Sequence, residues 1–403
     1  MTTTIDNEHK IFNVPNLRFP EFEGEWQEKR LSDIADLSKG IGISKDQLSA
    51  DGEPCILYGE LYTKYKSETI KEVISKTNID NTKLVKSKAN DVIIPCSGET
   101  AEEIATARCV LKDDILLGGD LNIIRLHGYD GSFMSYQLNG KRKYDIAKVA
   151  QGVSVVHLYG EHLKNIKTIN PSLNEQKKIA NLLSLLDERI STQNKIIEKL
   201  QSLIKGICNN YFLKLSHSQE MKSIRLGDIL KERNEYCCKD GTFVHGTLSK
   251  DGLFPKTERW NRDFLVKEEN KKYKITHLDD ICYNPANLKF GVICRNIYGD
   301  LIFSPIYVTF EVSKKVNIGF IELYLTNRNF IEKIRKFEQG TVYERMSVSP
   351  EDFLSYKIRI PSLSEQTFFY QKIQRLKNCS QNELEHLNLY KKLRQYLLRQ
   401  MFI

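Results

Sequence analysis

Apolar residues recur at helical spacing in two long stretches of the chain. In residues 171–214 they fit a heptad seam over roughly four to five repeats, with Gln193 as its one polar member. The predicted members of this seam are Leu183, Leu186, Ile190, Ile197, Leu200 and Ile204. A second seam in residues 361–403 contains Ile373, Leu376, Leu387 and Leu397 and is interrupted by Ser380, Glu383 and Arg394. A half-polar helix of about 60 Å has little stability alone, so we expect the two helices to pair.

Both helices begin with the same signature just after a proline. Ser172 and Ser362 each stand three residues before a glutamate, Glu175 and Glu365. A serine followed at this spacing by a glutamate is the pattern of a capping box, in which each side chain bonds the backbone of the other residue. The sequence therefore predicts two helices that start in the same way.

This signature belongs to a repeat that organises the chain. The segment Pro171-Ser-Leu-Asn-Glu-Gln176 recurs as Pro361-Ser-Leu-Ser-Glu-Gln366, and the correspondence continues without a gap to Phe212 and Phe402. Upstream, Arg30-Leu-Ser-Asp-Ile34 matches Arg225-Leu-Gly-Asp-Ile229, and Gln151-Gly152 matches Gln339-Gly340. Between these anchors the similarity fades, apart from short echoes such as Asp91-Val-Ile-Ile94 and Asp280-Ile-Cys-Tyr283. The chain therefore consists of two tandem copies of one plan.

The parts between the helices carry short β-branched stretches separated by Gly, Asn and Pro, which indicates mixed α/β domains. We predict an α+β fold with two such domains and two long antiparallel coiled-coil helices, related as a pseudo-twofold tandem repeat. The predicted boundaries are 1–170 for the first domain with its N-terminal segment 1–24, 171–214 for the central helix, 215–360 for the second domain, and 361–403 for the C-terminal helix that pairs with the central one.

Composition narrows the class of protein without giving a function. The formal net charge is +8, from 60 Lys and Arg against 52 Asp and Glu, which permits a polyanionic partner. Nine cysteines scattered from Cys55 to Cys379 favour reduced thiols in a cytoplasm over a disulfide framework. No apolar run approaches the roughly 18 residues that span a bilayer, and the polar N-terminus does not fit a secretory leader. We therefore expect a cytoplasmic globular protein.

The motifs of common catalytic sites are missing from the sequence. There is no G-x-x-x-x-G-K-[ST] phosphate loop and no G-x-G-x-x-G turn after a strand. Asn284-Pro-Ala-Asn287 resembles the Asn-Pro-Pro-aromatic element of adenine methyltransferases, but it lacks the second proline and the aromatic residue. The cysteines lack C-x-x-C spacing and the histidines do not cluster, so we expect no metal site. Paired acids such as Asp279-Asp280 fit solvated turns. The sequence reads as a binding protein without catalysis.

Two variable domains, each followed by P-S-L-x-E-Q and a long helix, resemble the DNA-specificity subunit of type I restriction–modification systems. The N-terminal pattern is also similar to that family and comprises Val14-Pro-Asn-Leu-Arg-Phe19, Phe22, Gly24, Trp26 and Leu31. The stretch from Gln339-Gly340-Thr341 through Arg345, Ser349 and Pro350 to Pro361 resembles the family's approach to the helix. In the first copy, Val156-His157 stands where the second has Glu344-Arg345.

This resemblance implies a subunit without catalysis or bound cofactor, in a bacterial cytoplasm. Each variable domain would be a target recognition domain that reads one half of a bipartite site in double-stranded DNA. The paired helices would space the half-sites and dock two copies of a modification subunit, which carries S-adenosylmethionine and methylates adenine N6. Motor–nuclease subunits that use ATP and Mg would join this core. Because the two variable parts differ greatly, we expect an asymmetric target. The alternative is a coiled-coil scaffold for protein interactions without DNA specificity.

Base edges and phosphates are contacted by Arg, Lys, polar and aromatic side chains on loops. Such residues occur in the first domain as Lys39, Lys45, Tyr62, Lys64, Lys66, Ser97 and Thr100, and in the second as Lys250, Lys256, Arg259, Trp260, Arg262, Lys289, Arg295, Tyr343 and Arg345. The glycines between Lys39 and Lys45 would let the backbone approach a phosphate closely. For each candidate a solvated surface role is the alternative, and Trp260 could equally anchor the core.

Overall fold

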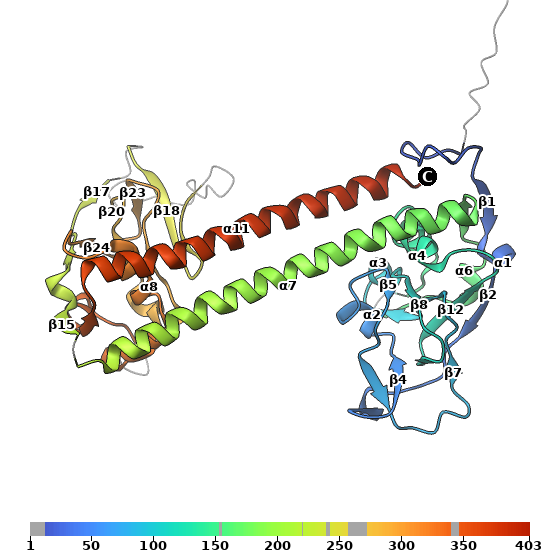
Figure 1. Cartoon of the computed structure of the whole chain (residues 1–403), viewed down its shortest axis with the longest axis horizontal. Coiled ribbons are helices and arrows are strands. Elements are labelled where there is room, and N and C mark those ends of the chain that lie inside the picture. Colours follow the sequence, from blue (N-terminus) through green and yellow to red (C-terminus); the bar gives the residue numbers. More distant parts are fainter. Residues whose placement is uncertain (1–12, 153–154, 220, 239–241, 257–271, 340–345) are drawn as a thin grey trace, which may run out of the picture. The chain divides into compact units, whose positions relative to one another are not determined.

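The computed structural model describes residues 13–152, 155–219, 221–238, 242–256, 272–339 and 346–403 (Figure 1). They form two compact units. The first contains the residues up to 195 together with 384–403, and the second contains 196–383. Two long helices, α7 (Leu173–His217) and α11 (Leu363–Gln400), contribute one part to each unit. The part of each unit outside these helices is called its domain below.

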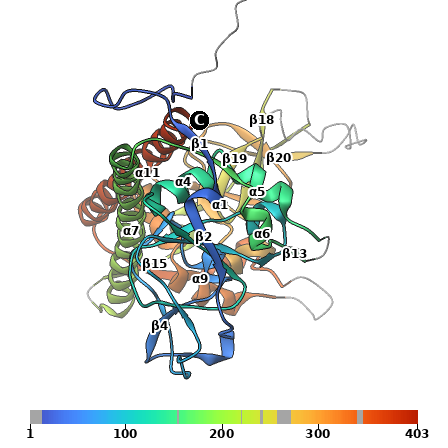
Figure 2. The same cartoon turned by 90° about the vertical axis from the view of Figure 1, so that its right-hand side faces the viewer.

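The first domain contains two five-stranded sheets. One has the strand order β2 (Ala35–Lys39), β12 (Leu121–Leu126), β8 (Asp91–Pro95), β10 (Arg108–Val110), β5 (Thr69–Ile70). The other has the order β3 (Leu48–Ser49), β6 (Ser75–Thr77), β4 (Glu53–Ile56), β11 (Leu116–Leu117), β7 (Val85–Lys86). The helical segments are α1 (Leu31–Ile34), η1 (Lys45–Gln47), α2 (Glu60–Thr63), α3 (Ala101–Ile104), α4 (Gly131–Asn139), α5 (Lys143–Val149) and α6 (Gly160–Leu163). Figure 2 shows this domain with α1 and β2 facing the viewer.

The second domain contains a four-stranded and a five-stranded sheet. Their orders are β16 (Leu230–Glu232), β24 (Val308–Val312), β21 (Ile281–Tyr283), β22 (Ile293–Arg295), and β17 (Tyr236–Cys237), β20 (Tyr273–Thr276), β23 (Leu301–Phe303), β18 (Val244–Ser249), β19 (Gly252–Pro255). The helical segments are η2 (Leu226–Asp228), η5 (Pro285–Phe290), α8 (Ile318–Leu325), α9 (Arg328–Ile334), η6 (Arg335–Phe337) and α10 (Pro350–Ser355).

The repeat is visible where each domain meets its long helix. In the first unit β1 (Gln27–Arg30) pairs antiparallel with β14 (Lys167–Asn170), and in the second β15 (Lys222–Arg225) pairs antiparallel with β25 (Lys357–Ile360). In both units, the strand that enters the domain therefore lies beside the strand that leaves it for the helix.

The glutamine that ends each P-S-L-x-E-Q segment joins the helix to its domain. Gln176 and Gln366 are both 1% exposed. The side-chain oxygen of Gln176 accepts from the backbone N–H of Asp130, the cap of α4, and that of Gln366 accepts from Asn317, the cap of α8. Each amide nitrogen donates to the carbonyl of the motif proline. Because a buried amide needs partners, this position requires glutamine in both copies.

Asp91 and Asp280 form a second matched pair, at the start of the central strands β8 and β21. They are 1% and 2% exposed, so the expectation of a solvated turn at Asp280 is wrong. Each carboxylate accepts from a backbone N–H three residues earlier, at Lys88 and His277, and closes a turn. Each also pairs with a guanidinium, Arg125 and Arg233 respectively, which compensates the buried charge.

The two long helices pack antiparallel. In the first unit the beginning of α7, at Leu183, shares a core with the end of α11, at Leu397. In the second unit Tyr211, near the end of α7, stacks on Phe369 near the start of α11, with ring centroids 3.8 Å apart. The α+β architecture predicted from the sequence, two mixed domains with long paired helices, is confirmed.

The predicted seam residues are all buried or partly buried. The buried ones are Leu183, Leu186, Ile197, Ile373, Leu387 and Leu397, and the partly buried ones are Ile190, Leu200, Ile204 and Leu376. Gln193 is also buried, at 2% exposed. None of the helices within the described ranges has the length and apolar character needed to cross a bilayer.

The two predicted capping boxes differ in structure. Glu365 accepts from the backbone N–H of Ser362 at 3.0 Å, as a capping box requires. Ser172 accepts from the backbone N–H of Glu175, but the Glu175 carboxylate binds Arg18, whose Nε and Nη2 each lie 2.7 Å from one carboxylate oxygen. The first box is therefore only half formed, because the N-terminal segment supplies a charged partner there.

The last residues of the chain complete the core of the first unit. Phe402 is 3% exposed and stacks on Phe133 of α4 with 5.1 Å between the ring centroids, and Phe133 contacts Trp26 edge-on at 5.8 Å. The backbone N–H of Leu17 donates to the carbonyl of Gln400. The C-terminal part of the predicted helix 361–403 thus belongs to the first unit.

Candidate nucleic-acid interface

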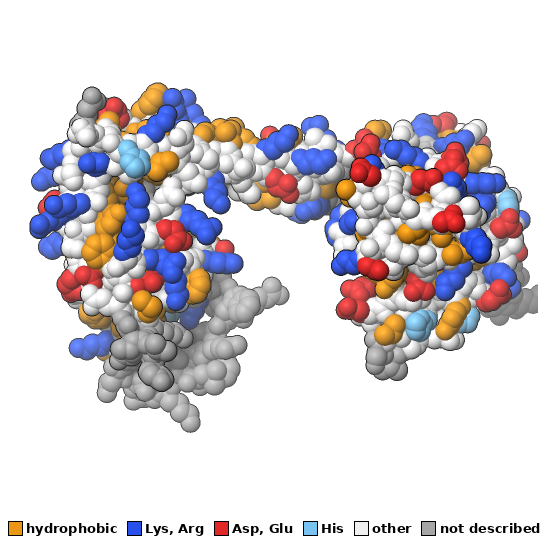
Figure 3. Space-filling view, turned by 90° about the horizontal axis from the view of Figure 1, so that it is seen from below, with side chains coloured by type: hydrophobic (Ala, Val, Ile, Leu, Met, Phe, Trp, Pro, Cys, Tyr) orange, Lys and Arg blue, Asp and Glu red, His pale blue; other side chains and the backbone are white. Residues whose placement is uncertain are grey.

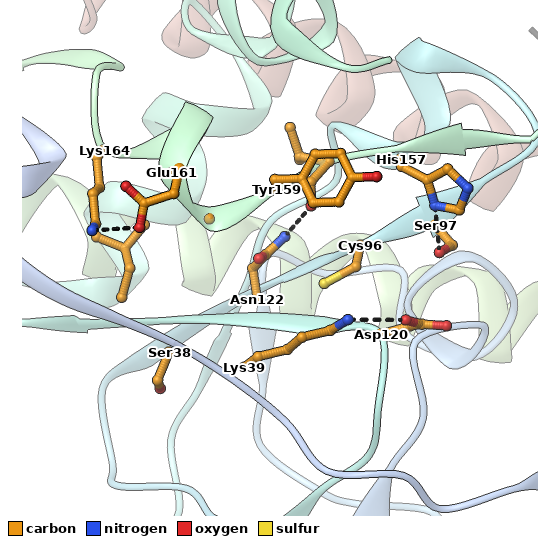
Figure 4. A pocket seen from close by; sticks show the side chains of 13 residues that line it. Ser38, Lys39, Cys96, Ser97, Asp120, Asn122, His157, Tyr159, Glu161 and Lys164 are labelled. Carbon is orange, nitrogen blue, oxygen red and sulfur yellow. Dashed lines mark hydrogen bonds and ion pairs between the residues drawn. The ribbon is translucent and has the colours of Figure 1, made fainter. Parts of the chain in front are cut away.

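A pocket of about 340 Å³ in the first domain brings together residues from five short elements (Figure 4). Lys39 ends β2, Ser97 lies on β9 (Ser97–Gly98), Asn122 lies on β12, and His157 lies on β13 (Val156–His157). Tyr159 precedes α6 and is 54% exposed. Of the predicted DNA-contacting residues, Lys39 and Ser97 line this pocket.

Hydrogen bonds hold the polar groups of the pocket in place. The pairing of β9 with β13 sets Ser97 opposite His157, and Ser97 Oγ lies 3.3 Å from His157 Nδ1. From outside the lining, the Tyr62 hydroxyl donates to the Ser97 carbonyl at 3.0 Å. Burial raises the pKa of Tyr62, so this hydroxyl stays protonated and remains a donor. Predicted residues Tyr62 and Ser97 are therefore in contact.

The charges of the pocket are balanced within it. Lys39 pairs with Asp120 at 3.4 Å, and Lys164 pairs with Glu161 at 2.6 Å. Phosphates are bound by cations and backbone N–H groups, whereas base edges are read by uncharged donors and acceptors as well. The hydroxyl of Ser97 and the imidazole of His157 are groups of the second kind, whereas Asn122 is 3% exposed and its amide nitrogen donates to the Leu158 carbonyl at 3.0 Å. The pocket therefore suits an uncharged hydrogen-bonding partner better than a bare anion.

The glycine-rich turn beside Lys39 has a packing role. A Cβ at Gly40 would lie 2.1 Å from the carbonyl oxygen of Gly118, and one at Gly119 would lie 3.0 Å from Cα of Gly42. The two backbones touch, which accounts for Gly40 without a phosphate. A Cβ at Gly42 would meet nothing within 4 Å. Lys45 is exposed at the start of η1, outside the pocket lining.

The remaining candidates of the first domain have local partners. Lys64 Nζ lies 2.6 Å from both Glu60 Oε1 and Ser75 Oγ. Lys66 is exposed, and its Nζ donates to the Tyr62 carbonyl at 2.9 Å. Thr100 caps α3 by accepting from the Glu103 N–H. All three side chains therefore have partners within the domain.

The second domain presents a looser set of candidates. Lys250 and Lys256 are exposed at the two ends of the β18–β19 hairpin. Lys289 is exposed on η5, 5.3 Å from the ring of Phe290, which is 66% exposed. Arg295 on β22 is held by Glu322 at 3.3 Å, so its charge is largely compensated. The other predicted residues, Arg259, Trp260, Arg262, Tyr343 and Arg345, lie outside the described residues.

The segment Asn284-Pro-Ala-Asn287 forms a capped turn at the end of β21. Asn284 is 7% exposed, and its side-chain oxygen accepts from the backbone N–H groups of Ala286 and Asn287. The side chain is thus engaged by its own backbone. Over the described ranges, no three His, Cys, Asp or Glu side chains are grouped so that they could hold a metal ion.

Sequence reasoning missed His157, Asn122 and Tyr159. His157 marked a difference between the two copies, but nothing in the sequence paired it with Ser97, which lies 60 residues earlier. On the face shown in Figure 3, basic side chains of each unit are interspersed with acidic and hydrophobic ones.

Comparison with known proteins gives consistent results. Residues 23–202 match the family model described as the type I restriction modification DNA specificity domain. The type I restriction enzyme MjaVIII specificity subunit of Methanocaldococcus jannaschii is 24% identical over 397 residues, which cover 92% of this chain and 90% of that protein.

Solved structures share the fold at low sequence identity. The crystal structure of the S subunit of a type I restriction–modification system from M. genitalium superposes with a TM-score of 0.60 at 18% identity, covering 97% of this chain and 99% of that one. A structure concerned with complex assembly and conformational transition of the type I system has a TM-score of 0.52 at 13% identity, covering 94% and 97%. With the repeat and the paired helices, these findings show that residues 23–202 match the type I restriction modification DNA specificity domain and that the chain resembles type I restriction–modification specificity subunits over nearly its whole length.

Proposed function

We propose that this chain reads an asymmetric bipartite DNA target, one half with each domain, and directs N6-adenine methylation or cleavage by partner subunits. The observation that supports this best is a shared buried scaffold beneath different surfaces. Each domain has a buried glutamine, Gln176 or Gln366, that bonds a helix cap. Each also has a buried aspartate, Asp91 or Asp280, that closes a turn. The Ser97–His157 pair of the first domain has no counterpart in sequence, because Ala286 and Arg345 stand at the matching positions. Different surfaces on one scaffold suit different half-sites.

In the first domain, the uncharged groups of the pocket would read base edges, and exposed cations would contact phosphates. Ser97 and His157 provide the hydrogen-bonding groups for the first task. Lys45 and Lys66 are exposed and suited to the second. In the second domain, Lys250, Lys256 and Lys289 would contact phosphates, since all three are exposed.

Catalysis would belong to partner subunits. Two copies of a modification subunit, which bind S-adenosylmethionine, would dock on the helical regions, and motor–nuclease subunits would use ATP and Mg. Exposed apolar side chains on the helices support such docking. In the first unit, Leu389, Leu393 and Tyr396 of α11 are 60%, 46% and 54% exposed and follow one helix face. The chain itself would neither methylate nor cleave DNA.

Mapping N6-methyladenine in host DNA with and without this gene tests the proposal. The expected result is one interrupted motif that vanishes on deletion. Exchange of residues 27–170 with those of a relative should then change one half of the motif only. Residues 13–26 stay in place in this design, because Trp26 packs with the C-terminal residues of the same unit. A change in both halves would contradict the assignment of one half-site to each domain.

Substitutions in the first domain separate base reading from phosphate contact. S97A with H157F should relax the motif at one or two positions of a single half, at a cost of about 1–3 kcal/mol in discrimination. K45A with K66A should weaken binding to all duplexes and reduce its salt dependence, because fewer counterions are released. Absence of binding to any duplex DNA, together with capture of proteins only, would favour the scaffold alternative.

The spacer role of the helices has its own test. Insertion of one heptad after Gln193 and one at the matching place in α11 preserves the paired seams. It lengthens both helices by about 10 Å, or roughly three base pairs of B-DNA. The gap of the methylated motif should widen while both halves stay the same. An unchanged gap would contradict a spacer role.

A further inference from the structure

A cluster of buried charges joins the first domain to both long helices. Arg394 of α11 donates from Nε to Asp187 of α7 at 2.5 Å and from Nη2 to Glu68 of the domain at 2.6 Å. The Tyr136 hydroxyl on α4 donates to the other oxygen of Asp187 at 2.7 Å. All four residues belong to the first unit. We refer to them as the Arg394 cluster.

The cluster is well shielded from water. The side chains of Glu68 and Asp187 are each 10% exposed, that of Arg394 is 23% exposed, and Tyr136 is 1% exposed. Burial raises the pKa of Asp187, and the guanidinium of Arg394 opposes this effect. In the sequence Arg394 interrupts the apolar seam, and the structure shows that it does so to bind two carboxylates at once.

Stability alone does not require charges at this place. Removing ions from water is costly, and well-packed apolar replacements of buried ion clusters are often at least as stable. The second unit illustrates the apolar solution, because there the helices pack through stacked Tyr211 and Phe369 with Phe212 and Phe320 around them. What charges add is directionality, since hydrogen bonds to a planar guanidinium form over a narrow range of angles.

We propose that Arg394 is a positioning residue that fixes the angle of the first domain on the α7–α11 pair. Its Nη2 binds the domain through Glu68, and its Nε binds α7 through Asp187. A rotation of the domain about the helices would break both bonds that the cluster makes to the domain, from Arg394 to Glu68 and from Tyr136 to Asp187, while leaving the bond from Arg394 to Asp187. The orientation that satisfies all three bonds is therefore selected.

The consequence for DNA reading rests on the proposed function. If each domain reads one half-site, the angle of the first domain sets which spacer length places both half-sites in register. A domain held at one angle accepts one spacer. A domain that samples several angles should accept spacers one base pair longer or shorter, without any change in the bases read.

The test replaces the cluster by apolar side chains in E68L/D187L/R394M. Lys71 and Glu188 form an ion pair between the same domain and α7 but are 45% and 49% exposed, so K71M/E188L is the matched control. Fluorescence energy transfer between non-canonical residues at Lys76 and Lys391, both exposed and both in the first unit, reports the domain's orientation without DNA. The melting temperature of each variant reports stability.

Wild type and K71M/E188L should give one narrow distance distribution. The apolar variant should melt within about 3 °C of wild type and give a clearly broader distribution. In the assembled methyltransferase, it should modify targets with spacers one base pair off the preferred length at least ten times better than wild type does. R394K, which keeps the charge but reaches only one carboxylate well, should lie between the two and serves as the test if the apolar variant does not fold.

A distribution as narrow as that of wild type in the apolar variant, or in R394K, would overturn the positioning role. If the apolar variant melts at a lower temperature but keeps the wild-type distance distribution and spacer preference, the cluster only stabilises the fold. That result would also overturn the positioning role. Because the distance measurement uses no DNA, it decides the positioning role even if the chain proves to read no bipartite target.

Discussion

At the residue scale, His277 in the second domain is held between two carboxylates. Its Nδ1 lies 2.8 Å from Asp300 and its Nε2 lies 3.1 Å from Glu235, while Arg233 also contacts Glu235. Burial lowers the pKa of His277, but the hydrogen bonds to Asp300 and Glu235 outweigh this and raise it above its ordinary value. Two carboxylate acceptors are best satisfied by the imidazolium, which has two donors.

A raised pKa in the folded state gives stability that is fully present below the unfolded pKa of about 6.5 and is lost as pH rises through the folded value. The second unit of wild type should therefore be more stable at pH 6 than at pH 8, by up to about 1 kcal/mol for this partly exposed group. H277Q should lose that difference. Urea midpoints, followed by thiol labelling of buried Cys282, measure it. H127Q, which removes an exposed histidine from the first domain, is the control and should leave the difference intact.

Individual site residues were predictable only where the residue type itself carried the signal. Lys39 and Ser97 could be named because basic and hydroxyl side chains are among the groups that contact phosphates and base edges. His157 could not, because its place depends on the pairing of β9 with β13, which contain two residues each. The solvated turn expected at Asp280 was wrong for a similar reason, because only the fold shows that Asp280 is buried and paired with Arg233.

At the scale of elements, the two helix starts show how one sequence signature supports two structures. Glu175 is 1% exposed and Arg18, its bidentate partner, is 14% exposed. Loss of one partner from such a pair leaves the other charge buried, at a cost on the order of 3 kcal/mol. Glu365 is fully exposed and makes only a local cap. E175A should therefore destabilise the first unit much more than E365A destabilises the second.

Thiol labelling of Cys109 for the first unit and of Cys282 for the second separates the two effects. The double mutant R18A/E175A should regain much of the stability that E175A loses, because the unpaired guanidinium of Arg18 is then gone. Equal effects of E175A and E365A would indicate two ordinary capping boxes and would contradict the pairing with Arg18.

The long helices could be predicted as elements because their periodicity extends over many turns. For the domains, only the mixed α/β class could be predicted, and not the individual strands or their order. Strands such as β5, β7 and β11 contain two residues each, too few to show a period of two, and the buried run Asp91–Pro95 of β8 has no alternation at all. The glutamine of P-S-L-x-E-Q was visible as a repeated letter, but its role required the caps of α4 and α8, which lie dozens of residues upstream.

At the scale of the molecule, the first unit is built from both ends of the described chain. Trp26, Phe133 and Phe402 form one aromatic group, and Arg142 donates to the Ile403 carbonyl at 3.3 Å. The predicted antiparallel pairing of residues 361–403 with the central helix brings the end of this helix near the first domain, but no local pattern shows that Phe402 enters the core of that domain. This contact lets the helix pair anchor the domain at two places along the chain.

Substitution of Phe402 by Ala should therefore destabilise a domain that precedes it by more than 200 residues in sequence. Phe402 is 3% exposed, and loss of a buried phenyl ring typically costs about 3–5 kcal/mol. Cys109 should become accessible to a thiol reagent at lower urea, while Cys282 in the second unit should be labelled as in wild type. L389A, on α11 before Phe402 and 60% exposed, is the matched control and should change neither midpoint by more than about 0.5 kcal/mol. Equal sensitivity of Cys109 and Cys282 to F402A would mean that the two units unfold together, and no change at Cys109 would mean that the C-terminal residues do not complete the first core.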